Sequence, residues 1–92
     1  NNYPNPYLAD IHNNGVFVDY FLEKQGEANL SVFDVNGRLI KDICSRFSHE
    51  YTLESCWWNG LDEHGRSVPS GTYFIRLNGR GINDVSKQTY IR

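Results

Sequence analysis

The stretch "WWNGLDEHGRSVPSGTYFIRL", residues 57–77, decides the fold of this chain. Its end, "GTYFIRL", alternates apolar and polar residues as a half-buried strand does. Neighbouring strand residues face opposite ways, so only one of Trp57 and Trp58 can enter a core cleanly. Between them and the strand lie Asn59-Gly60 and His64-Gly65, dipeptides that favour tight turns. We therefore interpret the polar middle as a corner between two strands, with Ser70-Gly71 starting the second strand.

The same signals continue outward along the chain. Asn-Gly, the strongest short hairpin signal, occurs at 14–15, 36–37, 59–60 and 78–79. No segment shows a sustained helical apolar period. The alternating runs between the turns predict strands at 15–22, 28–35, 38–43, 50–58, 71–77 and 84–91, with a further edge strand in "PYLADI". About seven short strands predict an all-β, immunoglobulin-like or fibronectin-III-like antiparallel β-sandwich.

Size and charge restrict the possible functions. Ninety-two residues predict one domain over 1–92, and no apolar run reaches the roughly 18 residues of a membrane helix, so we expect no membrane insertion. The net charge is −2, divided as −6 over residues 1–63 and +4 over residues 64–92. The positive charges of residues 64–92 either steer this end of the chain toward an acidic partner or only lie on solvent-exposed faces. Basic residues do not cluster with aromatic ones on one element, so we expect no nucleic-acid binding.

Cys44 and Cys56 allow at most one internal disulfide. If they lay on adjacent antiparallel strands joined by residues 45–49, Cys44 would face about residue 50. Cys56 would then be about 20 Å away at ~3.3 Å per residue, too far to bond. A connection that switches sheets would bring the two sulfurs together. The sequence leaves both arrangements open.

The chain resembles the C-terminal immunoglobulin-like sorting domain of type IX secretion substrates, and also the immunoglobulin-like domain of the flagellar hook-capping protein. The resemblance rests on the joint order of "YPNP", "LSVFDVNGRLIKDI", "WNGLDEHGRSVPSGTYFIRL" and the terminal "SKQTYIR". It covers nearly the whole chain and aligns Trp58 with the core tryptophan of the family. Asn59 stands where the family usually has Asp, and Asn makes the same turn bonds. The structural positions of the pattern are Pro4, Asn5, Pro6, Asp34, Asn36, Gly37, Trp58, Gly60 and Gly65.

The resemblance implies a non-catalytic C-terminal module of a longer secreted protein. Such a module directs its cargo across the outer membrane of a Gram-negative bacterium and to the cell surface. Its partners would be proteins of the secretion and attachment machinery. The last two strands hold the sorting information in the family, which places it here at Gly71, Tyr73, Leu77, Lys87, Ile91 and Arg92.

Sites for catalysis or metal binding have little support in the sequence. The chain lacks the G-x-S-x-G and H-E-x-x-H motifs and any Cys/His spacing that suits zinc. Asn59, Asp62, Glu63 and His64 are dense enough to suggest metal ligands, but they match no EF-hand spacing, and turn bonds explain them. We therefore expect no catalytic residue, no metal, no cofactor and no small-molecule substrate.

Exposed strand edges carry the remaining possibility of recognition. The terminal segments "YPNPY" and "SKQTYIR" are candidates for unpaired edges, which can accept a strand from another chain. Strand addition by a translocon would suit a sorting domain, and the same physics would suit a structural subunit of an extracellular assembly. Lysine and arginine on these strands would steer a partner or only protect the edge. A third hypothesis is carbohydrate binding through Trp57 and neighbouring rings.

Overall fold

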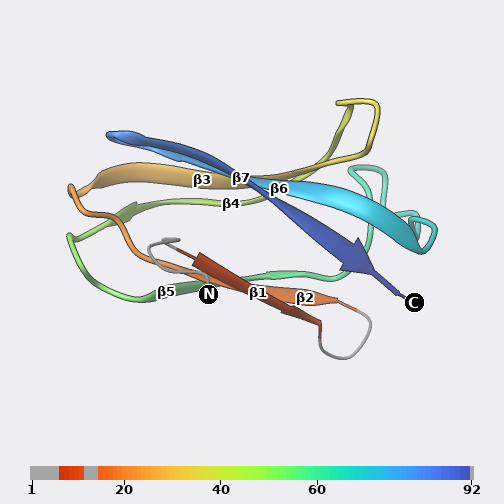
Figure 1. Ribbon diagram of the computed structural model, residues 1–92, viewed down its shortest axis with the longest axis horizontal. Coiled ribbons are helices and arrows are strands. Elements are labelled where there is room, and N and C mark those ends of the chain that lie inside the picture. The colour runs from red at the N-terminus through yellow and green to blue at the C-terminus, as the bar shows by residue number, and fades with distance from the viewer. Residues whose placement is uncertain (1–6, 12–14, 92) are drawn as a thin grey trace.

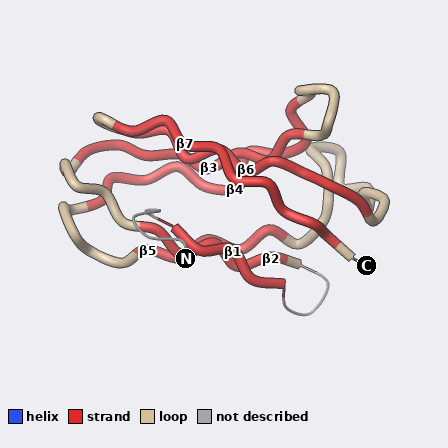
Figure 2. Tube along the Cα trace, in the orientation of Figure 1, coloured by secondary structure: helices blue, strands red, loops and turns tan. Residues whose placement is uncertain are grey.

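The computed structural model describes residues 7–11 and 15–91, and its described part is all-β, as predicted. A three-stranded antiparallel sheet in the order β1-β2-β5 faces a four-stranded antiparallel sheet in the order β4-β3-β6-β7 (Figure 1). Loops gather mainly at the ends of these two layers (Figure 2). The strands are β1 (Tyr7–Ile11), β2 (Val16–Tyr20), β3 (Gly26–Phe33), β4 (Leu39–Ser48), β5 (Glu54–Trp58), β6 (Gly71–Gly79) and β7 (Ile82–Tyr90). No helix in these residues is long and apolar enough to cross a membrane.

The core lies between the two sheets and follows the predicted alternation. On β2, Val16, Val18 and Tyr20 are buried, whereas Phe17 between them is 42% exposed. The apolar faces of β3 and β6 are buried in the same way, because a period of two puts alternate side chains on one face. The buried residues of both sheets form one cluster, which includes Val16, Val18, Tyr20, Leu22, Leu30, Val32, Trp58, Tyr73, Ile75, Leu77 and Tyr90.

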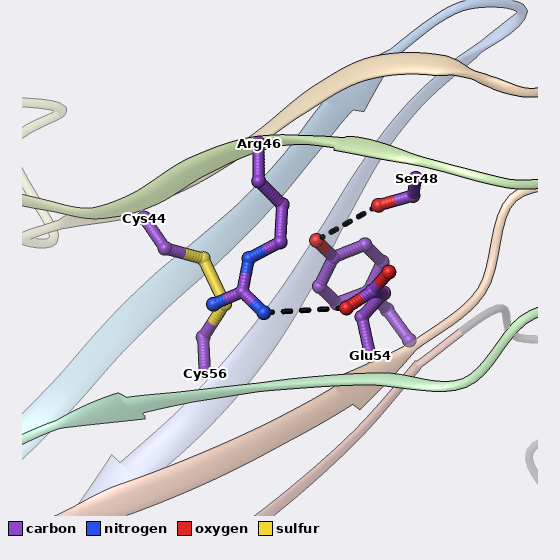
Figure 3. The surroundings of a disulfide bond; sticks show 6 residues. Cys44, Arg46, Ser48, Glu54 and Cys56 are labelled. Atoms are coloured by element: carbon purple, nitrogen blue, oxygen red, sulfur yellow. Dashed lines mark hydrogen bonds and ion pairs between the residues drawn. A yellow bond between two sulfur atoms is a disulfide. The ribbon is translucent and has the colours of Figure 1, made fainter.

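A disulfide joins the two sheets at one side of the sandwich (Figure 3). Cys44 on β4 and Cys56 on β5 have Cα atoms 6.5 Å apart. These strands belong to different sheets, so the connection between them switches sheets, one of the two arrangements that the sequence left open. Arg46 lies beside the bridge, and its guanidinium donates hydrogen bonds to the carboxylate of Glu54 at 3.2 Å and to Cys56 Sγ at 3.6 Å. Covalent and polar links thus tie β4 to β5.

The predicted strand over 50–58 was wrong at its beginning. β4 continues to Ser48, beyond the predicted end at residue 43, and β5 begins only at Glu54. The chain turns between them at Tyr51, which has a positive φ of 54° and donates its backbone N–H to the carbonyl of Leu22 at 2.8 Å. The change of sheet requires this turn, and residues 51–53, Tyr-Thr-Leu, include none of the residue types that typically signal a turn.

The fourth Asn-Gly pair does not form the predicted turn. β6 and β7 pair through Gly79 and Ile82, so the hairpin turn is Arg80-Gly81, with Gly81 at a φ of 76°. Gly79 lies against the neighbouring strand instead, where a Cβ would come within 3.2 Å of both Ala28 Cβ and the carbonyl oxygen of Glu27. Close packing therefore explains this glycine. The Asn36-Gly37 pair does lie in the predicted hairpin, between β3 and β4.

Candidate functional site

The structure places the predicted sorting residues on β6 and β7 in two different environments. Tyr73 and Leu77 are buried in the core, where they hold β6 against the other sheet. Gly71 begins β6 and pairs with Tyr90, next to Ile91, which is 62% exposed. Lys87 is exposed on β7. Arg92 and the motif residues Pro4, Asn5 and Pro6 lie outside the described residues. Only part of the predicted set therefore presents side chains to a partner.

The last described strand, β7, lies at an edge of the four-stranded sheet. Among the described strands it pairs only with β6, so one side of its backbone has no strand partner. Its outer-face positions, Asn83, Val85, Lys87 and Thr89, are exposed, and the positions between them are half-buried. An edge strand of nine residues with an exposed lysine can accept a further strand by backbone hydrogen bonds, with side chains adding selectivity.

The outer face of the same sheet carries residues that the sequence analysis did not single out. Phe33 on β3, Phe74 on β6 and Lys87 on β7 stand opposite one another across three strands. The next row of this face contains Arg76, whose guanidinium carbon lies 4.9 Å from the centre of the Phe33 ring. The sequence contains a signal for this placement, because successive residues of a strand such as "TYFIRL" face opposite ways. If Tyr73 and Leu77 face the core, Phe74 and Arg76 face outward.

The two tryptophans have separate roles, as their adjacency requires. Trp58 is 1% exposed, and its indole N–H donates to the carbonyl of Leu61 at 2.9 Å. Trp57 is 37% exposed on the outer face of the three-stranded sheet, and its ring lies 4.6 Å from that of Phe17. It also packs over Gly15, where a Cβ would come within 2.5 Å of the indole. Contacts within the chain thus account for part of the Trp57 surface.

Two five-residue turns, Asp34–Arg38 and Asp62–Arg66, have the same structure. In each, the aspartate carboxylate accepts backbone N–H bonds from the second and fourth residues after it. The arginine that ends the turn also pairs with this carboxylate, at 3.2 Å in the first and 3.4 Å in the second. Gly37 and Gly65 have φ values of 81° and 79°. The shared spacing Asp-x-x-Gly-Arg in "DVNGR" and "DEHGR" could have revealed this equivalence.

These turn bonds stabilise the ionised form of both aspartates. The backbone N–H of Arg38 is the main cause that lowers the pKa of Asp34, and that of Arg66 lowers the pKa of Asp62 in the same way. Both carboxylates are therefore committed to their own turns. This accounts for the polar density of residues 59–66, and no group of three or more metal-ligating side chains occurs anywhere in the described ranges.

The lowered pKa values predict that the turns lose stability in acid. The folded state binds fewer protons than the unfolded state at these two groups, so their contribution is present above the unfolded pKa of about 3.9 and is lost as pH falls through the folded pKa. Urea midpoints measured from neutral to acid pH should fall less steeply in the variant Asp34→Asn/Asp62→Asn than in the wild type. Glu63→Gln is the control, because Glu63 lies in the second turn without accepting its amide bonds. Equal slopes for all three proteins would contradict this role.

Comparisons with known proteins identify no family and no relative from which a function of this surface could be inferred. The sequence matches no protein-family model and no curated protein. The candidate site is therefore defined by its geometry: the edge of β7 that has no partner among the described strands, and the outer face of the sheet that β7 ends.

Proposed function

We propose that this domain is a non-catalytic sorting and anchoring module, which directs a secreted protein across the outer membrane of a Gram-negative bacterium through type IX secretion. The observation that carries the proposal is the position of β7. The final described strand, in which the sequence resemblance places sorting information, is an edge strand with an exposed outer row that includes Lys87. Secretion and attachment proteins would bind there by strand addition.

The disulfide supports an extracytoplasmic site of action. Disulfides form and persist in oxidising compartments, and small secreted domains use them to supplement a limited core. The Cys44–Cys56 bridge joins the two sheets of a 92-residue chain. A domain that crosses the periplasm and remains outside the cell would keep such a link, because both compartments are oxidising.

We further propose that the sandwich is of the immunoglobulin-like, fibronectin-III-like type. The support is the strand order, in which β1-β2-β5 faces β4-β3-β6-β7. The chain changes sheets from β2 to β3, from β4 to β5 and from β5 to β6, as in sandwiches with Greek-key connections. In this arrangement the last strand lies at a sheet edge, where it is accessible for recognition.

The proposal predicts that residues 1–92 are sufficient for export. Fused to the C-terminus of a fluorescent cargo that has its own signal peptide, they should bring the cargo to the cell exterior in a host with the type IX apparatus. The readout is the fraction of cargo degraded when intact cells are treated with protease. A verified sorting domain from that host is the positive control, and the same host without the translocon is the negative one. Cargo that stays periplasmic with this domain while the verified domain exports it would refute the function.

A further inference from the structure

We propose that a groove on the outer face of the four-stranded sheet, lined by Arg76, binds an acidic segment of a partner protein that carries apolar side chains beside its carboxylates. The groove has a volume of about 360 Å³. Its apolar walls are Phe33, Val35, Phe74 and Val85, and Asp34 also lines it. It is a side-chain site on the sheet face, distinct from the backbone edge of β7.

Arg76 is the residue of this groove that has an unused hydrogen-bond donor. Its Nε atom is buried and has no hydrogen-bond partner among the described residues. Stacking over the Phe33 ring at 4.9 Å satisfies the face of the guanidinium but none of its N–H donors. A buried donor without a partner is costly, and the cost is greater for a charged group. A carboxylate that entered the groove could accept from the guanidinium, and a shift of the Arg76 side chain that exposes Nε would let the carboxylate accept from Nε and a terminal nitrogen together, the paired geometry that arginine favours.

Two carboxylates near Arg76, those of Asp34 and Asp42, are already engaged. Asp34 accepts from the amides of its own turn and pairs with Arg38. Asp42 shares a row of the sheet with Arg76, but Ser31 stands between them and donates its hydroxyl to Asp42 at 2.7 Å. The ion pairs of the described residues include neither Arg76 nor Lys87. Neither of these two cations therefore forms an ion pair with a carboxylate of the described part of the chain.

The apolar walls of the groove indicate which kind of ligand would bring a carboxylate to Arg76. Val35 and Val85 are 65% and 60% exposed, so a ligand with apolar groups beside its carboxylate would remove both from water. A bare inorganic anion would leave these walls exposed. An anionic membrane normally attracts clusters of four to eight basic residues, and this face has two. An acidic peptide that also carries apolar side chains can provide a carboxylate for Arg76 and cover the exposed valines.

Defined peptides test this assignment on the isolated domain. The probe is a blocked, fluorescently labelled peptide in which pairs of glutamates alternate with pairs of valines, so that both residue types occur on each face of the extended chain. Its match has glutamine in place of each glutamate. Fluorescence anisotropy at low salt should show the glutamate peptide binding at least roughly tenfold more tightly, since a charge-assisted bidentate pair distinguishes the two. Arg76→Gln should lower the affinity about tenfold and Lys87→Gln by less, whereas Arg80→Gln, the same loss of charge in the β6–β7 turn, should leave it unchanged. Thermal unfolding of each variant verifies its folding, and Lys87→Gln keeps the test valid if Arg76→Gln unfolds.

Several outcomes would overturn the proposal. Equal binding of the two peptides would show that the carboxylates are not recognised. Equal losses of peptide affinity in Arg76→Gln and Arg80→Gln would show that the peptide responds only to the net charge of the domain. Binding to vesicles of anionic lipid but not to the glutamate peptide would assign the face to a membrane surface. Concentration-dependent dimerisation abolished by Arg76→Gln would assign it to a second copy of the chain.

Discussion

Replacing Cys44 and Cys56 together by alanine should lower the free energy of unfolding by about 3 kcal/mol, because a bridge across 12 residues removes loop-closure entropy from the unfolded chain. Domains of this size are stable by roughly 5–15 kcal/mol, so the loss is a large part of the total. The bridge also connects two sheets that share no backbone ladder between β4 and β5. Its removal should therefore loosen the side of the sandwich at which Arg46 meets Glu54.

Urea unfolding with and without a reductant measures this effect. The wild type should lose stability on reduction and then match the double-alanine variant, which should itself be insensitive to the reductant. A double variant as stable as the oxidised wild type would show that the bridge does not stabilise the fold. A further fall of the double variant on reduction would show that the reductant acts elsewhere.

Trp58→Ala should cost about 3–5 kcal/mol, the range for removing a large buried ring. Trp58 is 1% exposed and packs against Tyr73 and Tyr90, with ring centres 5.5 Å and 5.1 Å away. It therefore joins β5 of one sheet to β6 and β7 of the other. The substitution also leaves the carbonyl of Leu61 without its indole donor. Because the loss is comparable with the lower end of the roughly 5–15 kcal/mol range for domains of this size, the variant should unfold at a much lower urea concentration than the wild type.

The neighbouring Trp57 provides a matched control. Trp57→Ala removes the same side chain one residue away, but that side chain is 37% exposed and packs on Phe17 over the outer surface. Its cost should be nearer 1 kcal/mol, because less apolar surface is returned to water. Urea midpoints of the two variants give the comparison. Similar losses at both positions would contradict the assignment of Trp58 alone to the core.

The sequence predicted the parts of the fold that depend on local chemistry. Alternation identified the core face of β2, and the turn at Asn36-Gly37 lies where its residues favour it. The change of sheet between β4 and β5 could not be read in this way. It depends on Tyr51 adopting a positive φ through a hydrogen bond to distant Leu22, and neither residue type signals it. The sequence could not decide whether Cys44 and Cys56 form a disulfide for the same reason, because the distance between them depends on that change of sheet.

The candidate surface was only partly predictable. Tyr73 and Leu77 came from the resemblance as sorting positions, and the structure places them in the core. Lys87 came from the same source and lies on the exposed face of an edge strand. Arg76 was not singled out, because its unpartnered Nε depends on packing against Phe33, which lies 43 positions earlier in the chain. Cross-strand neighbours of this kind become visible only when the register is known.

The most direct test of the account is export of the cargo fusion with one charge reversed on β7. Lys87→Glu changes the exposed row of the terminal strand, and Lys24→Glu makes the same change at an exposed position between β2 and β3. The protease-accessible fraction of cargo on intact cells is measured for both. If β7 is the recognised strand, Lys87→Glu lowers this fraction sharply, and Lys24→Glu exports like the wild type. Equal export of the two folded variants would contradict recognition through this face of β7.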